Sequence, residues 1–113
     1  MIDPKDSRVV KTSLADMIRV VAALEQHGHR DLAQALKELT QRVAGSPGRR
    51  QTRHEIIEYL VYIGQQAALH PEQRNPGLLQ AALRSAKDDV EALGTLSEAW
   101  DTYGQAIEEF FSL

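Results

Sequence analysis

The feature that most constrains the fold is the spacing of apolar residues, which recur at intervals of three and four along most of the chain. The first such run consists of Leu14, Met17, Ile18, Val21 and Leu24. This spacing places apolar side chains on one face of an α-helix, whereas a half-buried strand needs alternation of apolar and polar residues. No segment sustains such alternation. The sequence therefore predicts an all-α protein, a compact bundle of four to five helices.

The N-terminal half predicts an antiparallel pair of helices. Ser13 and Asp16 form an S-x-x-D start, and Gly28 is expected to end the first helix. A second helix is expected from Asp31 to Gly45, where a positive φ angle suits glycine. Because the connection between the two helices is short, they should form a hairpin.

The helix that follows the loop at 46–51 is predicted to be the central one. Thr52 and Glu55 stand in the T-x-x-E relation of a capping box, in which each side chain pairs with a backbone N–H of the first turn. The next residues are apolar nearly all the way round the helix: Ile56, Ile57, Tyr59, Leu60, Val61, Tyr62 and Ile63. A helix of this kind is normally enclosed by other helices.

The C-terminal third predicts two more helices, either separate or fused into one long bent helix. Asn75 and Pro76 supply a helix cap and a first-turn proline. An apolar seam follows, formed by Leu79, Leu83, Ala86, Val90 and Leu93. The seam then slips by one residue, and Gly94 with a second T-x-x-E pair, Thr95 and Glu98, favours a break or kink at that point.

Length and composition fit one folded domain. The chain has 113 residues, of which 42% are hydrophobic and 26% charged, so wholesale disorder is not expected. We expect residues 1–12 to be a flexible leader and residues 13–113 to form a single helical-bundle domain.

The sequence contains no membrane or export signal that we can identify. Its longest apolar runs, VVAAL and YLVYI, are far shorter than the roughly 20 residues that cross a bilayer, and the N-terminus lacks the basic and apolar parts of a signal peptide. Cysteine is absent, which excludes disulfides and thiol chemistry. A cytoplasmic location is the expectation.

Charge is distributed unevenly along the chain. The net formal charge is −3, but residues 1–57 carry ten Lys or Arg against seven Asp or Glu, and residues 58–113 carry three against nine. Such polarity favours the docking of one half of the fold on the other, or of one copy on another. It disfavours an anionic polymer as a partner.

The segment RHEIIEY at 53–59 is one residue short of the H-E-x-x-H zinc motif. His54 and Glu58 would share a helix face, and a metal centre would need a further ligand. The candidates are His27, His29 and His70. Because Glu58 replaces the second histidine and Glu55 is explained by capping, we favour a helix start over a metal site and expect no cofactor. The alternative is an enzyme or a small-ligand binder with a bundle pocket around His54 and Glu58.

The dense basic cluster of the sequence consists of Arg42, Arg49, Arg50 and Arg53. It precedes a predicted helix N-terminus, where a phosphate or a carboxylate can bind. We favour a solubilising loop that offsets the acidic half of the chain. A nucleic-acid accessory protein that uses these arginines is a further alternative, but it normally has a basic domain overall.

The C-terminal segment is the most distinctive part of the sequence. Its apolar face, here called the aromatic stripe, consists of Trp100, Tyr103, Ile107, Phe110 and Phe111. One interpretation is that this helix closes the core. The other is that part of the stripe stays exposed and contacts a partner, because Trp and Tyr are enriched in interfaces. A homodimer would satisfy both interpretations.

The function that the sequence favours is a non-catalytic module for protein–protein interaction, such as an adaptor, a regulatory protein or an immunity-type protein. We expect it to self-associate as a homodimer. The aromatic stripe is the predicted contact surface, and the arginine cluster is a second, electrostatic patch. Neither nucleic acid nor a membrane is expected as a partner.

Overall fold

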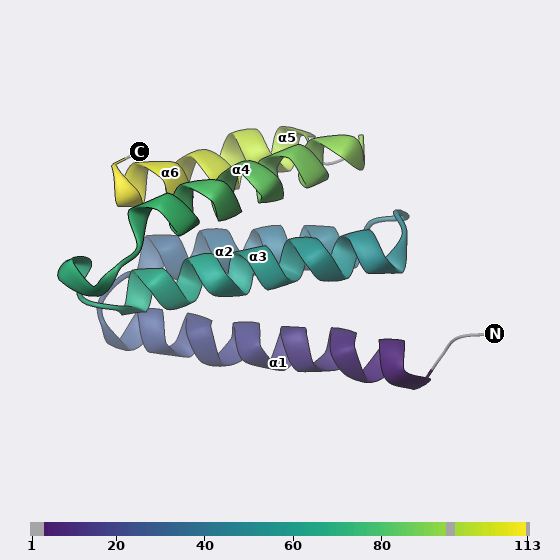
Figure 1. The fold of residues 1–113 in the computed structure, drawn as a ribbon, viewed down its shortest axis with the longest axis horizontal. Coiled ribbons are helices and arrows are strands. Elements are labelled where there is room, and N and C mark those ends of the chain that lie inside the picture. Colours follow the sequence, from purple (N-terminus) through teal and green to yellow (C-terminus); the bar gives the residue numbers. More distant parts are fainter. Residues whose placement is uncertain (1–3, 95–96, 113) are drawn as a thin grey trace.

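The computed structural model describes residues 4–94 and 97–112, and the side chains of residues 14–94 and 98–112. The elements are α1 (Pro4–Gln26), α2 (Arg30–Ala44), α3 (Arg50–Ala68), the 3-10 turn η1 (Pro71–Gln73), α4 (Pro76–Ala92), α5 (Ser97–Ala99), the π-helical segment η2 (Trp100–Gly104) and α6 (Gln105–Phe111) (Figure 1). The last three elements follow one another as one C-terminal helix. The predicted all-α bundle is therefore confirmed.

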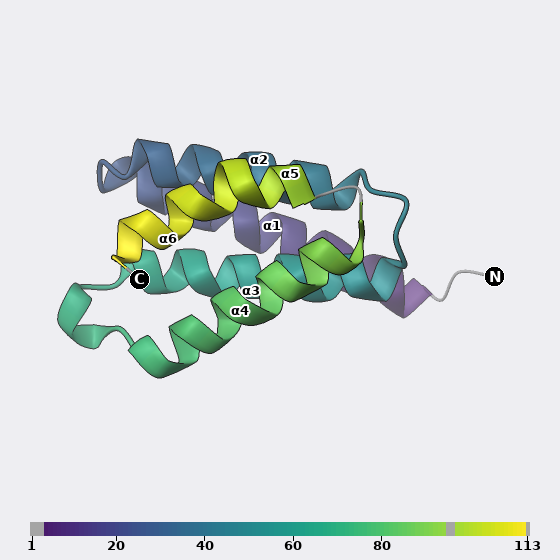
Figure 2. The same ribbon diagram turned by 90° about the horizontal axis from the view of Figure 1, so that it is seen from above.

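The helices form three layers, with α2 and α3 in the middle (Figure 1). On one side, α1 packs against both middle helices. On the other side, α4 packs against α3, while η2 and α6 pack against α2. Figure 2 shows that α4 and the C-terminal helix run in opposite directions over this second face. The layers place each amphipathic helix with its apolar side toward one shared core.

The core is centred on α3, as its sequence predicts. This helix contacts α1, α2 and α4, and its Ile56, Leu60 and Ile63 are completely buried. The apolar stripe of α2 is buried as well: Leu32, Leu36, Leu39 and Val43. So is most of the α4 seam: Leu79, Leu83, Ala86 and Val90. Burying a side chain of this size contributes about 1.5–3 kcal/mol, so these rows dominate the stability of the bundle.

Gly64 allows the outer layer to approach the middle layer closely. A Cβ atom at this position would overlap with Val20 of α1 and lie 3.2 Å from Cδ1 of Leu36 in α2. Glycine inside a helix costs about 0.5–1 kcal/mol relative to alanine. Here the close packing of three helices offsets that cost.

Two glycines with positive φ angles reverse the chain. Gly28 has φ +83° after α1, and Gly94 has φ +73° after α4; residues with a Cβ rarely adopt such angles. The helix after Gly94 runs back along α4 (Figure 2), so the alternative of one long bent helix is wrong. Thr95, part of the predicted capping pair, lies outside the described residues. Gly45 has φ −87°, so the positive φ predicted there is also wrong.

The predicted start of the first helix is wrong. α1 begins at Pro4 rather than at Ser13, so residues 4–12 of the expected leader are helical. Proline suits the first turn of a helix, because its missing N–H would have no partner there and its φ angle is already helical.

The predicted capping box of α3 is wrong as well. The helix begins at Arg50, and Arg49 is its N-cap residue, with no side-chain hydrogen bond to the first turn. The side chain of Glu55 instead accepts a hydrogen bond from Nε2 of Gln51 at 3.4 Å. Thr52 therefore lies within the first turn instead of capping it. The local T-x-x-E pattern is present, but the N-cap is Arg49, three residues before Thr52.

Candidate functional site

The aromatic stripe divides between the core and the surface. Trp100 is 2% exposed and Ile107 is completely buried, so both belong to the core. Three other members are half-buried: Tyr103, Phe110 and Phe111. The indole of Trp100 packs on Gly104, where a Cβ atom would lie 2.8 Å from its Cγ. The part of the stripe that reaches the surface is thus smaller than the sequence suggests.

Arg74 connects the end of α3 to the end of α6, a role that no pattern in the sequence predicts. Its Nε donates to the carbonyl oxygen of Gln66 at 2.9 Å, and its Nη2 donates to that of Ala67 at 3.1 Å. Its guanidinium carbon lies 5.5 Å from the ring centroid of Phe110 and 5.3 Å from that of Phe111. Arg74 therefore satisfies helix-terminal carbonyls and makes cation–π contacts with the last turn.

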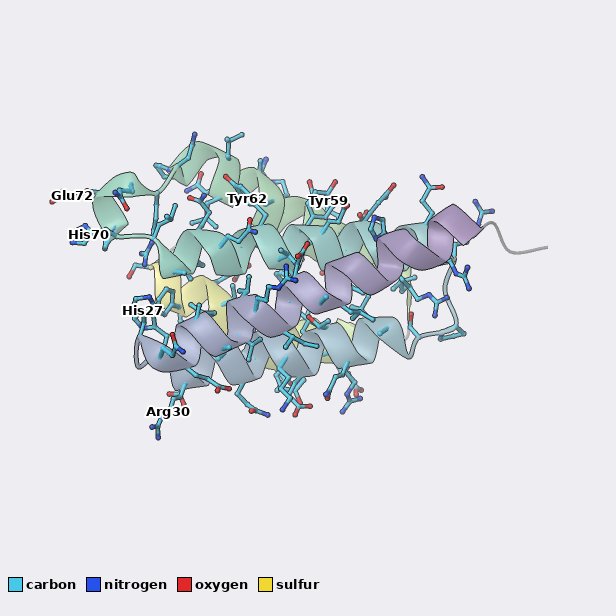
Figure 3. All side chains as sticks on the ribbon, turned by 90° about the horizontal axis from the view of Figure 1, so that it is seen from below. His27, Arg30, Tyr59, Tyr62, His70 and Glu72 are labelled. Carbon is cyan, nitrogen blue, oxygen red and sulfur yellow. The ribbon has the colours of Figure 1, made fainter. Side chains whose placement is uncertain are left out.

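The histidines are divided between the two ends of the bundle. Nε2 of His54 lies 3.0 Å from Oε1 of Glu58, near the start of α3. The others lie at the opposite end, where α3 finishes and α2 begins (Figure 3): His27, His29 and His70. Within the described part of the chain, no group of three or more His, Asp or Glu side chains is placed to hold a metal ion. The ligand set considered from the sequence is therefore not brought together.

The four arginines of the basic cluster differ in exposure. Arg42 and Arg49 are exposed, and Arg50 and Arg53 are half-buried. Nη1 of Arg53 donates to the carbonyl oxygens of Ala44 and Ser46, both at 3.1 Å. Arg53 therefore holds the C-terminal end of α2 against the first turns of α3, a structural role that the sequence does not reveal.

The contact between α3 and α4 brings carboxylates together. The pKa of Asp89 is raised above its ordinary value, mainly because burial disfavours the charged form, and further because Glu55 and Asp88 carry negative charge. At neutral pH this contact works against the packing of the two helices.

Replacing Asp89 by asparagine should therefore raise stability at neutral pH. A carboxyl group whose folded-state pKa is raised contributes stability below its unfolded pKa and loses that contribution as pH rises through the folded pKa. The urea midpoint of Asp89→Asn should exceed that of the parent at pH 7, and the difference should shrink toward pH 3.5. Asp101→Asn, at an exposed position, is the control. The prediction is contradicted if the parent protein is more stable than Asp89→Asn at pH 7.

An apolar groove of about 530 Å³ runs along α1 beside α2. The residues from α1 are Leu14, Met17, Ile18, Val21, Ala22 and Glu25. Those from α2 are Lys37, Thr40 and Gln41. Ile18 is 71% exposed, although its spacing in the sequence assigns it to the core. The apolar arc of α1 is wider than α2 and α3 can cover, and a sequence cannot show how many neighbours a helix will have.

The floor of this groove contains an unsatisfied polar group. Thr40 is 4% exposed, and its Oγ1 has no hydrogen-bond partner among the described residues. A buried hydroxyl without a partner costs about 1–3 kcal/mol. The groove thus has apolar walls, and the hydroxyl of Thr40 is buried beneath them.

Comparison of the chain with known protein families, with characterised proteins and with solved structures found no match. Among the described helices, none is both long enough and apolar enough to span a membrane.

Proposed function

We propose that this protein is a non-catalytic interaction module that forms a homodimer through the groove between α1 and α2. The observation that carries the proposal is the exposure of Ile18, a large apolar side chain that is 71% exposed within an apolar groove. Exposed apolar patches with polar rims are typical of interaction sites. The proposal keeps the expectation of a cytoplasmic protein without a cofactor, and it moves the contact surface from the aromatic stripe to α1.

The rim of the groove is complementary to itself in charge. Glu25 on α1 and Lys37 on α2 are both exposed and carry opposite charges. In a two-fold dimer, each patch meets its own copy in the reverse direction. An axis near Ala22 would bring Glu25 of each copy toward Lys37 of the other, and the small alanine would let the two α1 helices approach. Ile18 and Val21 then lie between two ion pairs.

The length of the groove also supports an occupant. From Leu14 to Glu25 the helix extends about 16 Å, enough for one helix to lie along another for two to three turns.

The substitution Ile18→Asp tests the proposal. It should weaken the dimer at least about tenfold, because a carboxylate would then have to be buried at the centre of the contact. Since Ile18 is exposed in a single copy, the substitution should change the unfolding free energy of the monomer by no more than about 0.5 kcal/mol. Size-exclusion chromatography with light scattering over a concentration series measures the first effect, and urea unfolding measures the second.

Leu78→Asp is the matched control. Leu78 is 57% exposed on α4, away from the groove, so its replacement should leave the dimer intact. The charge pair has its own test: Glu25→Lys and Lys37→Glu should each weaken association, and the double variant should restore it. A parent protein that stays monomeric over the whole series, or equal effects of Ile18→Asp and Leu78→Asp, would show that the groove is not the interface.

A further inference from the structure

A small cavity with basic walls lies between the end of α2 and the start of α3. Its volume is about 210 Å³, and the side chains that line it are those of Ala44, Arg50, Arg53, His54 and Ile57. Both arginines are half-buried. Water and salt therefore screen their charges less than they screen charges on an open surface.

The guanidinium group of Arg53 is only partly used by the protein. Nη1 is bonded to two carbonyl oxygens, as described above, but Nε is buried and has no acceptor among the described residues. Leaving such a donor unsatisfied lowers stability, and more so for a charged group. Native proteins normally satisfy it with a protein group, a water molecule or an ion. The side chains of Arg53 and Arg50 both line the cavity, so a ligand with several acceptor oxygens would meet guanidinium donors there.

The surroundings of the cavity add positive potential. Arg49 and Arg50 begin α3, and its first turn contains no acidic residue and no capping side chain. The N-terminus of a helix carries about half a positive charge, which favours anions and disfavours nearby arginines. Two arginines at this position therefore act against the stability of the free protein. An anion bound in the cavity beside Arg50 would offset this unfavourable contribution.

We propose that this cavity binds a phosphate group, held by the guanidinium groups of Arg50 and Arg53 with the imidazole of His54 beside it. Guanidinium groups match the spacing of phosphate oxygens and bond them in pairs. The small volume and the net charge of −3 favour a single phosphate group over a nucleic-acid chain. The cavity shares no residue with the α1–α2 groove, so the proposal holds whether or not the protein dimerises.

Titration with inorganic phosphate at pH 7, against sodium chloride at equal ionic strength, tests the site. The readouts are the imidazole resonances of His54 in NMR spectra and the thermal unfolding temperature. Phosphate should shift the His54 resonances in a saturable way and raise the unfolding temperature, because a ligand that binds the folded state stabilises it. A parallel titration with O-phosphoserine shows whether a free ion or a phosphate ester is bound more tightly.

Arg50→Gln should weaken phosphate binding at least about tenfold, the loss of one charge-assisted bond. Arg42→Gln is the matched control, because Arg42 is exposed at the same end of the bundle and does not line the cavity. Arg50→Lys, which keeps the charge, should show intermediate affinity and serves if the glutamine variant folds poorly. Any of three results would overturn the proposal. They are equal responses to phosphate and chloride, His54 resonances that shift without saturation, and equal phosphate affinity in the Arg50→Gln and Arg42→Gln variants.

Discussion

Replacing Trp100 by alanine is expected to lower the free energy of unfolding by about 3–5 kcal/mol. The indole is 2% exposed and packs on the backbone of Gly104, so its removal leaves a cavity that neighbouring side chains cannot readily fill. Small domains are stable by roughly 5–15 kcal/mol in total. The loss should therefore be plain in a urea unfolding curve followed by circular dichroism.

Tyr103→Phe is a suitable control for this experiment. Tyr103 lies in the same π-helical segment but is half-buried, and the substitution removes only a hydroxyl group. Its effect should stay within about 0.5 kcal/mol. If Trp100→Ala instead unfolds like the parent protein but elutes as a monomer where the parent is a dimer, then Trp100 belongs to an interface, as one interpretation of the sequence has it.

The second large effect is expected for Arg74→Ala, which should lower the free energy of unfolding by about 2–4 kcal/mol. The estimate combines two hydrogen bonds from a charged donor with cation–π contacts to Phe110 and Phe111. Because these contacts hold α6 to the end of α3, backbone amides of α6 should also exchange hydrogen faster. Urea unfolding and hydrogen-exchange mass spectrometry measure the two effects.

Two further variants show what Arg74 contributes. Arg74→Lys keeps the charge but lacks the planar group that reaches two carbonyl oxygens, so it should recover less than half of the loss. Arg84→Ala, at an exposed position on α4, should change stability by no more than about 0.5 kcal/mol. If Arg74→Lys matched the parent protein, charge alone would explain the effect; if Arg74→Ala matched Arg84→Ala, the contacts would contribute little.

Much of the fold could be predicted because its signals are local. Asn75 caps α4 as expected, and its Oδ1 accepts a hydrogen bond from the backbone N–H of Leu78 at 3.1 Å. Gly28 and Gly94 end their helices with positive φ angles. The apolar rows of α2, α3 and α4 are buried as their spacing predicts. Each of these features depends on residues within a few positions of one another.

The errors arose where distant parts of the chain decide the outcome. The T-x-x-E pattern at Thr52 does not start the helix, which begins at Arg50, where the side chain of Arg53 bonds to the carbonyl oxygens of Ala44 and Ser46 in the preceding helix and loop. A capping motif marks a residue that can begin a helix, but tertiary contacts decide which residue does begin it.

The candidate sites were missed for the same reason. The α1–α2 groove exists because α1 lies in an outer layer (Figure 1), and Ile18 on this helix stays 71% exposed. Arg74 matters because Gln66, Phe110 and Phe111 come together around it from separate elements. The sequence shows the arginine cluster, but the fold decides that Arg50 and Arg53 line a cavity and that Arg53 holds α2 to α3.

The π-helical segment η2 determines how the C-terminal helix meets its neighbours. The backbone N–H of Gln105 bonds to the oxygen of Trp100, five residues back instead of four. In an unbroken α-helix, Trp100 and Ile107 would lie almost in line, seven residues apart. The wide turn rotates Ile107 by about 100° relative to that line. Both side chains are nevertheless buried, since η2 contacts α2 and α4 while α6 contacts α2. Because the wide turn takes in one extra residue, deleting one residue there would restore a regular α-helix with α6 facing α2 as it does now, whereas closing the turn without a deletion would swivel α6 by more than a quarter revolution.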